Sequence, residues 1–309
     1  MTIHEAWLVG PSSAAEVDSF LSSHKPSLNR KDLGPWIWVQ IPRSKGKSSA
    51  DGEKEKPAEE LGSEDEGYAA FEKDAEKVMS ALDAKLQHVK ETAPVRGKKS
   101  AGIKSQKELR EVEHEKLRTD LEGLAKKHKI LSGKWLFFRT DDLVDAVWDK
   151  IVKAIALEDG PLAKTGVVST AKVSAFVEEG AKDPNHVICV YVNDSFDKDA
   201  VKQAFKVLVE DLGLVSSAYK ADAYTIAGID SNRPGGGFRS SLYSKTTFMK
   251  QEEIDEALKS GSKAKEVKKK TAEEEAAAGA NDGFDEASDK SSEEEEEEER
   301  PRKKAKSKK

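Results

Sequence analysis

Cysteine is almost absent from this sequence, and so are the long apolar runs that membrane-spanning segments need. The 309 residues include a single cysteine, Cys189, which excludes an intramolecular disulfide framework and a cysteine-cluster zinc site. No basic N-terminal segment precedes a long apolar run, and nowhere do 18 apolar residues follow one another. We therefore expect neither a secreted nor a membrane-spanning protein.

Apolar residues are also scarce for the length of the chain. They make up 37% of the sequence, and charged residues make up 36%, whereas an ordinary globular domain contains roughly 45–50% and 25%. Much of such a chain cannot bury enough apolar surface to offset its conformational entropy. We expect one modest domain with disordered attachments.

Charge of one sign does not dominate the chain as a whole. Lys and Arg number 52 and Asp and Glu 58, a net charge of -6. Residues 251–309 alone hold 14 basic and 19 acidic residues, so they carry nearly all of this excess. The part before them is close to neutral, and net charge does not exclude nucleic acid as a partner.

The usual catalytic motifs are missing as well. Gly46-Lys47-Ser48 ends like a phosphate-binding loop, but Ile41 stands where that loop needs its first glycine. His114-Glu115 lacks a second histidine four positions on. Cys189 and His186 lie in an apolar strand, which favours a buried thiol and a packed imidazole. The sequence predicts no enzyme, no metal and no cofactor.

Hydrophobic periodicity divides the chain into four parts. Residues 1–42 hold an N-terminal helix, capped by Ser12 or Ser13, and a first strand around Trp36-Ile37-Trp38-Val39. Residues 43–131 form a charged insertion with two amphipathic helices, residues 132–249 the main part of the domain, and residues 250–309 a disordered acidic and basic tail.

The two insertion helices carry apolar stripes of different widths. The first stripe comprises Tyr68, Phe71, Ala75, Val78, Met79, Leu82, Leu86 and Val89. The second comprises Leu109, Val112, Leu117, Leu121 and Leu124, on a heavily charged helix. The first must pack on something; the second is either a mostly solvated helix laid along the domain or a helix that binds a partner.

The densest globular pattern runs from Ser132 to Phe248. The expected strands are at 134–138, 186–192 and 224–229, and residues 166–169 and 172–176 are two more strands or one bent strand. The expected helices follow Thr140 and Asn193. Gly213 with Leu214 behind it predicts a left-handed cap at the end of the second helix. Because each helix has one apolar stripe, we predict an α+β fold in which helices cover one face of a curved, mainly antiparallel sheet.

Aromatic and basic residues recur around the predicted strands. Four tryptophans, Trp36, Trp38, Trp135 and Trp148, lie near cations in this group: Lys134, Arg139, Lys164, Lys172, Lys182, Lys220, Arg233, Arg239 and Lys245. Rings with nearby cations are the chemistry of single-stranded RNA and nucleotide binding. Tryptophans in strands also serve as core residues, and the sequence leaves both alternatives open.

The order of these elements resembles a known family. Trp36-Ile37-Trp38-Val39, Lys134-Trp135-Leu136-Phe137, the helix with Trp148, Gly166-Val167-Val168-Ser169, His186 to Val192 and Val201 to Leu214 follow the succession seen in translation initiation factor 4E, the messenger-RNA cap-binding protein. The chain is more similar still to the Bles-type family, a domain of unknown function with that fold. The resemblance covers roughly residues 34–42 and 132–248.

The resemblance implies functional roles for some residues. Trp135 falls near one cap-stacking tryptophan, Lys172 and Lys182 near the cations that contact phosphates, and Trp148 near the helix tryptophan that binds partner peptides. Cap-binding proteins also need a second tryptophan followed by glutamate, and residues 156–164, the matching connection, contain neither.

Two hypotheses of different classes follow. The first is a non-catalytic, monomeric module that binds RNA or a phosphorylated nucleotide, with Lys172, Lys182 and Arg239 on phosphates and Trp135 as a stacking surface. The second is a protein–protein adaptor that uses the helix face around Trp148 and the charged insertion. The basic cluster from Arg300 to Lys309 is typical of a nuclear import signal, which predicts a nuclear or cytoplasmic location.

Overall fold

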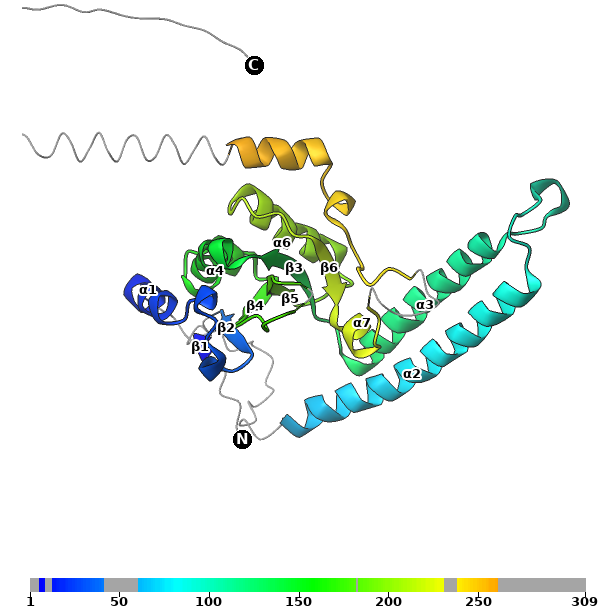
Figure 1. The fold of residues 1–309 in the computed structure, drawn as a ribbon, viewed down its shortest axis with the longest axis horizontal. Coiled ribbons are helices and arrows are strands. Elements are labelled where there is room, and N and C mark those ends of the chain that lie inside the picture. Colours follow the sequence, from blue (N-terminus) through cyan, green and yellow to red (C-terminus); the bar gives the residue numbers. More distant parts are fainter. Residues whose placement is uncertain (1–5, 9–12, 42–60, 182, 231–237, 261–309) are drawn as a thin grey trace, which may run out of the picture. The chain divides into compact units, whose positions relative to one another are not determined.

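The computed structural model of the chain describes residues 6–8, 13–41, 61–181, 183–230 and 238–260 (Figure 1). The predicted insertion segment 43–60, Lys182, Arg233 and the tail from residue 261 lie outside the described residues. None of the described helices combines the length and the apolarity needed to cross a bilayer.

A six-stranded sheet forms the centre of the fold. Its strands are β1 (Ala6–Leu8), β2 (Trp36–Gln40), β3 (Gly133–Arg139), β4 (Val168–Ser174), β5 (His186–Val192) and β6 (Ala218–Ala221). They lie in the order β1-β2-β4-β5-β3-β6. β1 runs parallel to β2, and every other neighbouring pair is antiparallel. The predicted α+β class with a mainly antiparallel sheet is confirmed.

Three helices cover one face of this sheet, as Figure 1 shows: α1 (Ala14–Ser23), α4 (Asp141–Ala156) and α6 (Lys198–Glu210). Local capping fixes where two of them begin. Ser13 and Glu16 form a reciprocal capping box at α1, and the Asp197 carboxylate accepts from two backbone N–H groups of α6. At the end of α6, the Leu214 N–H donates to Leu208 O, which confirms the cap predicted at Gly213.

Strand alternation decides which side chains enter this core. In β2, Ile37 and Val39 are fully buried against the helices, whereas Trp36, Trp38 and Gln40 alternate with them and are half-buried. In β3, Trp135 and Phe137 enter the core. The same sheet therefore has an apolar inner face and a mixed outer face.

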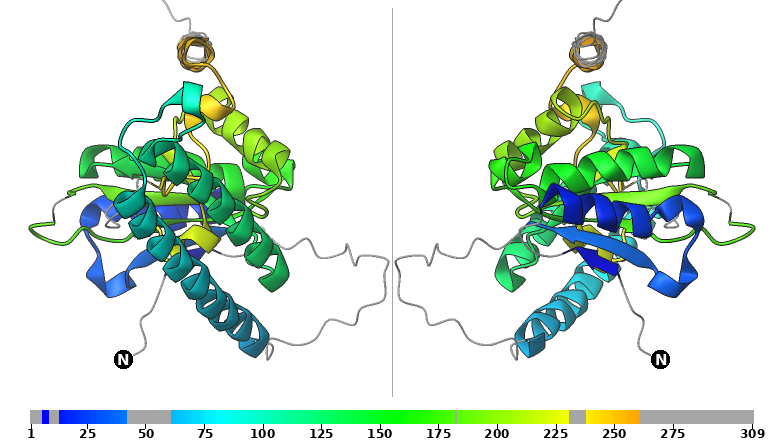
Figure 2. Two further views of the ribbon diagram at one scale, coloured as in Figure 1. Left: turned by 90° about the vertical axis from the view of Figure 1, so that its right-hand side faces the viewer. Right: turned by 90° about the vertical axis from the view of Figure 1, so that its left-hand side faces the viewer.

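The insertion helices form an antiparallel pair, which we call the arm. α2 (Leu61–Thr92) and α3 (Gln106–His128) lie side by side in Figures 1 and 2. The stripe predicted for α2 is buried at five of its eight positions, and Leu117 and Leu121 of α3 are buried in the same cluster. α3 is mostly exposed, as the first alternative for the second helix predicts, and the buried part of its stripe packs on α2.

The predicted last strand at Tyr224 to Ile229 is wrong. The strand β6 comes earlier, and Asp222 begins the short helix α7 (Asp222–Ile226). Tyr224 and Ile229 are buried against the arm. Their apolar character therefore reflects packing on α2 and α3 and not membership of a strand. Of the alternatives given between Gly166 and Phe176, the single strand is correct: it is β4, with an irregular register between Val168 and Thr170.

Short helical elements complete the described chain. They are η1 (Pro26–Leu28), η2 (Lys31–Leu33), η3 (Lys99–Ala101), α5 (Pro161–Thr165) and η4 (Lys245–Thr247), and residues 251–260 are helical. Ile254 of this last segment is fully buried in the main core. The domain thus continues beyond residue 249, where the sequence places its end.

Candidate functional site

The outer face of the sheet gathers side chains from five strands, and the strand register determines their arrangement. Trp38, Lys172, Cys189 and Leu136 lie in register across β2, β4, β5 and β3. The adjacent row contains Gln40, Thr170, Tyr191, Lys134 and Lys220. Both rows point away from α1, α4 and α6, because their alternating neighbours are buried beneath those helices.

Lys172 is the centre of a group of aromatic rings on this face. Its Nζ lies 4.0 Å from the ring centroid of Trp36 and 4.6 Å from that of Trp38. The ring of Tyr191 is 5.8 Å from the same ammonium, and it stacks on Trp38 with 6.1 Å between centroids and 18° between planes. All four contacts are within the range of cation–π or ring stacking interactions, so this group holds the ammonium in a fixed place.

Two further lysines lie beside this group. Lys134 Nζ is 5.4 Å from the Tyr191 centroid and forms an ion pair with Asp222 at 2.5 Å. Ser132 Oγ donates to the other oxygen of the same carboxylate at 2.6 Å. Lys220 is directly opposite Lys134 on β6. We call the group Trp36, Trp38, Lys172, Tyr191, Lys134 and Lys220 the ring-and-lysine surface.

Burial and, to a smaller extent, neighbouring cations shift the pKa values of two groups on this face of the sheet. The pKa of Lys220 is lowered by burial and, to a smaller extent, by the charge of Lys134. Burial raises the pKa of Cys189 to about 11, and the nearby Lys134 and Lys172 oppose this shift only in part. The thiol is therefore protonated at neutral pH and 3% exposed, which confirms the predicted buried cysteine and makes it a poor nucleophile.

A hollow opens at one end of the surface. Its volume is about 340 Å³, within the size of small-molecule sites. The walls combine Trp38 and Tyr191 of the sheet with Tyr68 of α2 and Asp222 and Ile226 of α7. The arm thus closes one side of a site whose floor is the sheet.

The structure separates the residues that the sequence grouped together. Lys172 lies at the centre of the ring-and-lysine surface, but Trp135 is fully buried on the opposite face of the sheet. Its ring packs on Phe205 at 4.7 Å and on Tyr219 at 5.0 Å. The expected stacking surface at Trp135 is therefore wrong, since strand alternation directs this ring into the core.

The other predicted site residues do not join this surface either. Lys182 lies outside the described residues. Arg239 is exposed and follows Phe238, whose ring packs on Tyr224 and on His114 of the arm. No contact among the described residues brings Arg239 to the ring-and-lysine surface.

Trp148 is not available for a partner on the helix face. Its side chain is fully buried between α4 and the sheet, and its indole Nε1 has no hydrogen-bond partner in the described chain. The expected partner-binding role of this tryptophan is wrong for the conformation described here. The adaptor hypothesis then depends on the charged insertion alone.

Sequence reasoning missed Tyr191 and Asp222, and it grouped Trp36 and Trp38 with nearby cations without assigning either ring to the site. The alternation Trp36-Ile37-Trp38-Val39 does place both tryptophans on one face, which is a usable signal. Tyr191 alternates with Val190 and Val192 in the same way, but the apolar run around it hides the pattern. Asp222 carries no such signal, because its role depends on the turn from β6 into α7.

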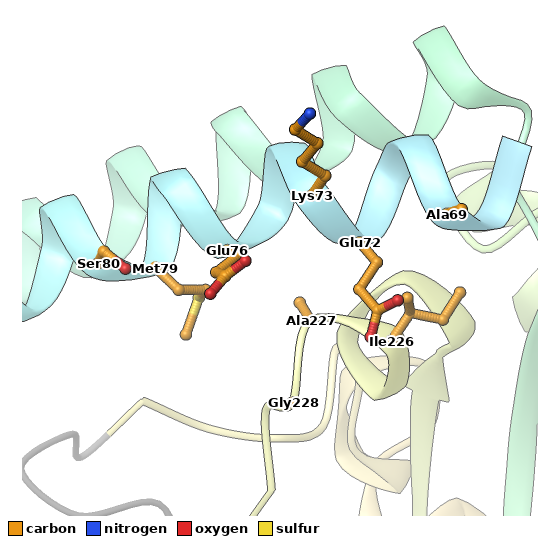
Figure 3. A pocket seen from close by; sticks show the side chains of 9 residues that line it. All are labelled: Ala69, Glu72, Lys73, Glu76, Met79, Ser80, Ile226, Ala227 and Gly228. Atoms are coloured by element: carbon orange, nitrogen blue, oxygen red, sulfur yellow. The ribbon is translucent and has the colours of Figure 1, made fainter.

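A second hollow, between α2 and α7, has the opposite electrostatic character (Figure 3). Its volume is about 460 Å³, and Glu72, Glu76, Ile226 and Gly228 are among its lining residues. Figure 3 shows the Glu72 carboxylate directed toward Ile226, while Lys73 points away from α7. Carboxylates repel phosphate, so this hollow is unsuited to a phosphorylated ligand.

His186 holds a structural position, as the sequence indicates. It is fully buried, and its Nε2 lies 2.9 Å from Asp141 Oδ1 at the start of α4. Its Nδ1 lies 2.9 Å from the backbone oxygen of Ser174. These contacts join β5, β4 and α4. In the described part of the chain, no three His, Cys, Asp or Glu side chains cluster as metal ligands do.

A family model matches most of the chain. The model described as "Basophilic leukemia-expressed protein Bles03" matches residues 9–228. The matched range contains β2 to β6, the arm and α7, and with them every residue of the ring-and-lysine surface.

Proposed function

Because this match spans well over half of its length, the chain belongs to the Bles03 family, and we propose that it is a non-catalytic module that binds RNA or a phosphorylated nucleotide on the ring-and-lysine surface. The resemblance to initiation factor 4E is part of the same proposal: it is supported by the antiparallel sheet with helices on one face and a ligand surface on the other.

The observation that carries the proposal is the convergence of Lys172, Lys134 and Lys220 with three aromatic rings on adjacent strands. A nucleotide offers a flat base that stacks on rings and a phosphate that pairs with ammonium groups. Stacking contributes roughly 1–3 kcal/mol per base. A purely apolar ligand would make no use of the positive charge of this surface, and a simple anion would make no use of its rings.

The hollow beside the surface supports a ligand of limited size. Its volume of about 340 Å³ fits one nucleotide more readily than a helix of a partner protein. Asp222 is the carboxylate nearest to it, but Lys134 and Ser132 both bind that group. A guanine-reading carboxylate is therefore not supplied by Asp222, and the proposal is for a general phosphorylated nucleotide or RNA and not for a cap.

The experiment is a titration of the full chain with a nucleoside triphosphate and with a 20-nucleotide oligouridine, followed by tryptophan fluorescence at low salt. We expect quenching, because Trp36 and Trp38 are half-exposed at the site whereas Trp135 and Trp148 are buried. The matched control is the double variant Trp36→Phe and Trp38→Phe, which removes the reporting rings. Unchanged fluorescence together with no binding by calorimetry would contradict the proposal.

Two related expectations stay predictions. Participation in translation depends on the proposed nucleotide or RNA binding. Nuclear localisation depends on the cluster from Arg300 to Lys309, which lies outside the described residues. Fusion of these ten residues to a fluorescent protein tests the second expectation directly: accumulation in the nucleus is the expected result, and an even distribution contradicts it.

A further inference from the structure

The loop that joins α2 and α3 has a charge unlike that of the rest of the chain. Between Ala93 and Ser105 it contains Arg96, Lys98, Lys99 and Lys104, and no acidic residue. The side chains of Arg96, Lys98 and Lys104 are exposed. No ion pair joins these three to another residue in the described part of the chain. The end of the arm is therefore a local concentration of positive charge on a chain that is acidic overall.

This loop is an ordered structure. Lys98 and Ile103 exchange backbone hydrogen bonds at 2.8 Å and 3.1 Å, which close a small turn. The side-chain amide of Gln106 donates to the carbonyl oxygens of Lys90 and Ala93 and so ties the end of α2 to the start of α3. A Cβ on Gly97 would lie 2.8 Å from Ile103 O, so the close backbone packing requires glycine there.

The order of the loop places its cations around two exposed apolar side chains. Val95 is 76% exposed and Ile103 is 47% exposed. The arm contacts the rest of the domain mainly through α7 and Phe238, away from this loop (Figure 1). Packing within the domain therefore does not explain why Val95 and Ile103 are exposed at this loop. Because the residues around them are basic, a negatively charged partner fits the loop best.

We propose that the loop at the end of the arm is a second contact for RNA, one that binds the phosphate backbone without reading the sequence. This inference rests on the proposed function, because a strand whose base lies on the ring-and-lysine surface continues as a row of phosphates. α2 connects the two places: Tyr68, near its start, lines the hollow, and Lys90, near its end, adjoins the loop. A nucleic-acid strand fits this arrangement better than an acidic peptide, whose carboxylates could pair with the lysines of the sheet but which has no base to stack on the rings.

The test compares salt dependence of binding for two matched triple variants of the full chain. One replaces Arg96, Lys98 and Lys104 by Gln; the other replaces the exposed lysines Lys198, Lys202 and Lys259 by Gln and loses the same charge elsewhere. The probe is labelled 20-nucleotide oligouridine, measured by anisotropy between about 50 and 200 mM salt. Single-stranded contacts contribute about 0.7 each to the slope of log affinity against log salt.

We expect the loop variant to lose about 2 units of slope and roughly tenfold to a hundredfold in affinity at the lowest salt. The control triple should keep the slope of the unmodified chain, and both variants should keep its melting temperature. An unchanged slope in the loop variant, or an equal loss in the control, would overturn the inference.

A mononucleotide distinguishes this inference from the proposed function. A nucleoside triphosphate is too short to reach both places, so the loop variant should bind it as the unmodified chain does. If the triphosphate binds and the oligouridine slope does not change, the sheet site stands and the loop contact is wrong. If no triphosphate binds and the loop variant still loses slope, nucleotide binding on the ring-and-lysine surface is wrong and the loop contact stands.

Discussion

The ammonium of Lys172 lies nearer to the ring of Trp36 than to that of Trp38, although Trp38 is the residue directly opposite Lys172 in the sheet. The distances to the two centroids are 4.0 Å and 4.6 Å. The lysine side chain thus leans along the strand and contacts two rings on the neighbouring strand. This contact fixes the position of the cation before any ligand arrives, and preorganised groups bind with less loss of side-chain entropy.

Removal of this cation should weaken nucleotide binding more than removal of an equally basic residue elsewhere. A hydrogen bond to a charged group contributes about 1.5–3 kcal/mol, so we expect Lys172→Gln to lower affinity by about that amount. Lys172→Arg should retain part of it. Lys164→Gln, on the exposed surface of α5, is the control. Calorimetric titration measures all three, and equal losses for Lys164→Gln and Lys172→Gln would contradict a specific role.

Loss of one ring should affect binding and leave folding nearly unchanged. Trp36→Ala removes a half-exposed stacking surface, and we expect a loss of about 1–3 kcal/mol in the binding of a nucleotide. Phe138→Ala is a suitable control because Phe138 also lies on the outer face, two strands away from Lys172, and is not one of the three rings around its ammonium. Affinity comes from titration and stability from urea unfolding. The role of the ring is refuted if both variants bind alike.

The buried tryptophans should behave in the opposite way. Trp135→Ala and Trp148→Ala each remove a fully buried indole, and such changes cost about 3–5 kcal/mol in the free energy of unfolding. Trp148→Phe should cost less, because the indole nitrogen of Trp148 has no hydrogen-bond partner to lose in the described chain. Urea unfolding gives these values. A Trp148→Ala variant of normal stability would show that this residue is not a core residue after all.

The depressed pKa of Lys220 predicts how nucleotide binding depends on pH. A bound phosphate favours the charged form of Lys220. Affinity is therefore highest below the pKa of Lys220 in the unbound protein, and it falls as pH rises through that pKa. That pKa lies below the usual lysine value of about 10.4. In Lys220→Arg the group stays charged, so the fall should begin at higher pH. Titrations between pH 7 and 10 test this, and superimposable pH profiles would rule out the coupling.

A carboxylate in the arm predicts how the stability of the fold depends on acid. Lys127, Lys77 and His128 donate to Asp74 and hold the pKa of its carboxyl well below the usual range. The resulting stability is present above the unfolded pKa of about 3.9 and is lost as pH falls through the folded pKa. In Asp74→Asn, the melting temperature should therefore fall less steeply with pH below pH 4 than in the unmodified chain. Glu76→Gln on the same helix should keep the steepness of the unmodified chain. Thermal melts across this range decide the matter.

Local patterns were enough to predict much of the fold. The helix capped at Ser13, the helix that follows Asn193 and the alternation in β2 are predicted from neighbours in the sequence. The helix at Asp222 was mistaken for a strand because tertiary contact with the arm, and not the local pattern, explains why Tyr224 and Ile229 are apolar. Long-range burial is the information that a single sequence lacks.

The candidate site was harder to predict than the fold. The resemblance to initiation factor 4E is what singles out Lys172 among many lysines. It does not place Trp135 correctly, because both faces of β3 carry large apolar residues. The face that a strand residue occupies depends on the registers β2–β4, β4–β5 and β5–β3, which join residues far apart in the chain. Tyr191 and Lys134 become neighbours only through these registers.

The order in which the strands leave the ribosome differs from the order in which they pair. The Thr170 hydroxyl bonds to the Val39 carbonyl across a sequence separation of 131 residues, and synthesis at about 5–20 residues per second leaves β2 without its neighbour β4 for several seconds or more. During this time the edge of β2 that later pairs with β4 has no partner strand, while the arm can form from local contacts. The nascent chain therefore exposes an aromatic strand that chaperones can bind, and completion of the ring-and-lysine surface is a late event in folding.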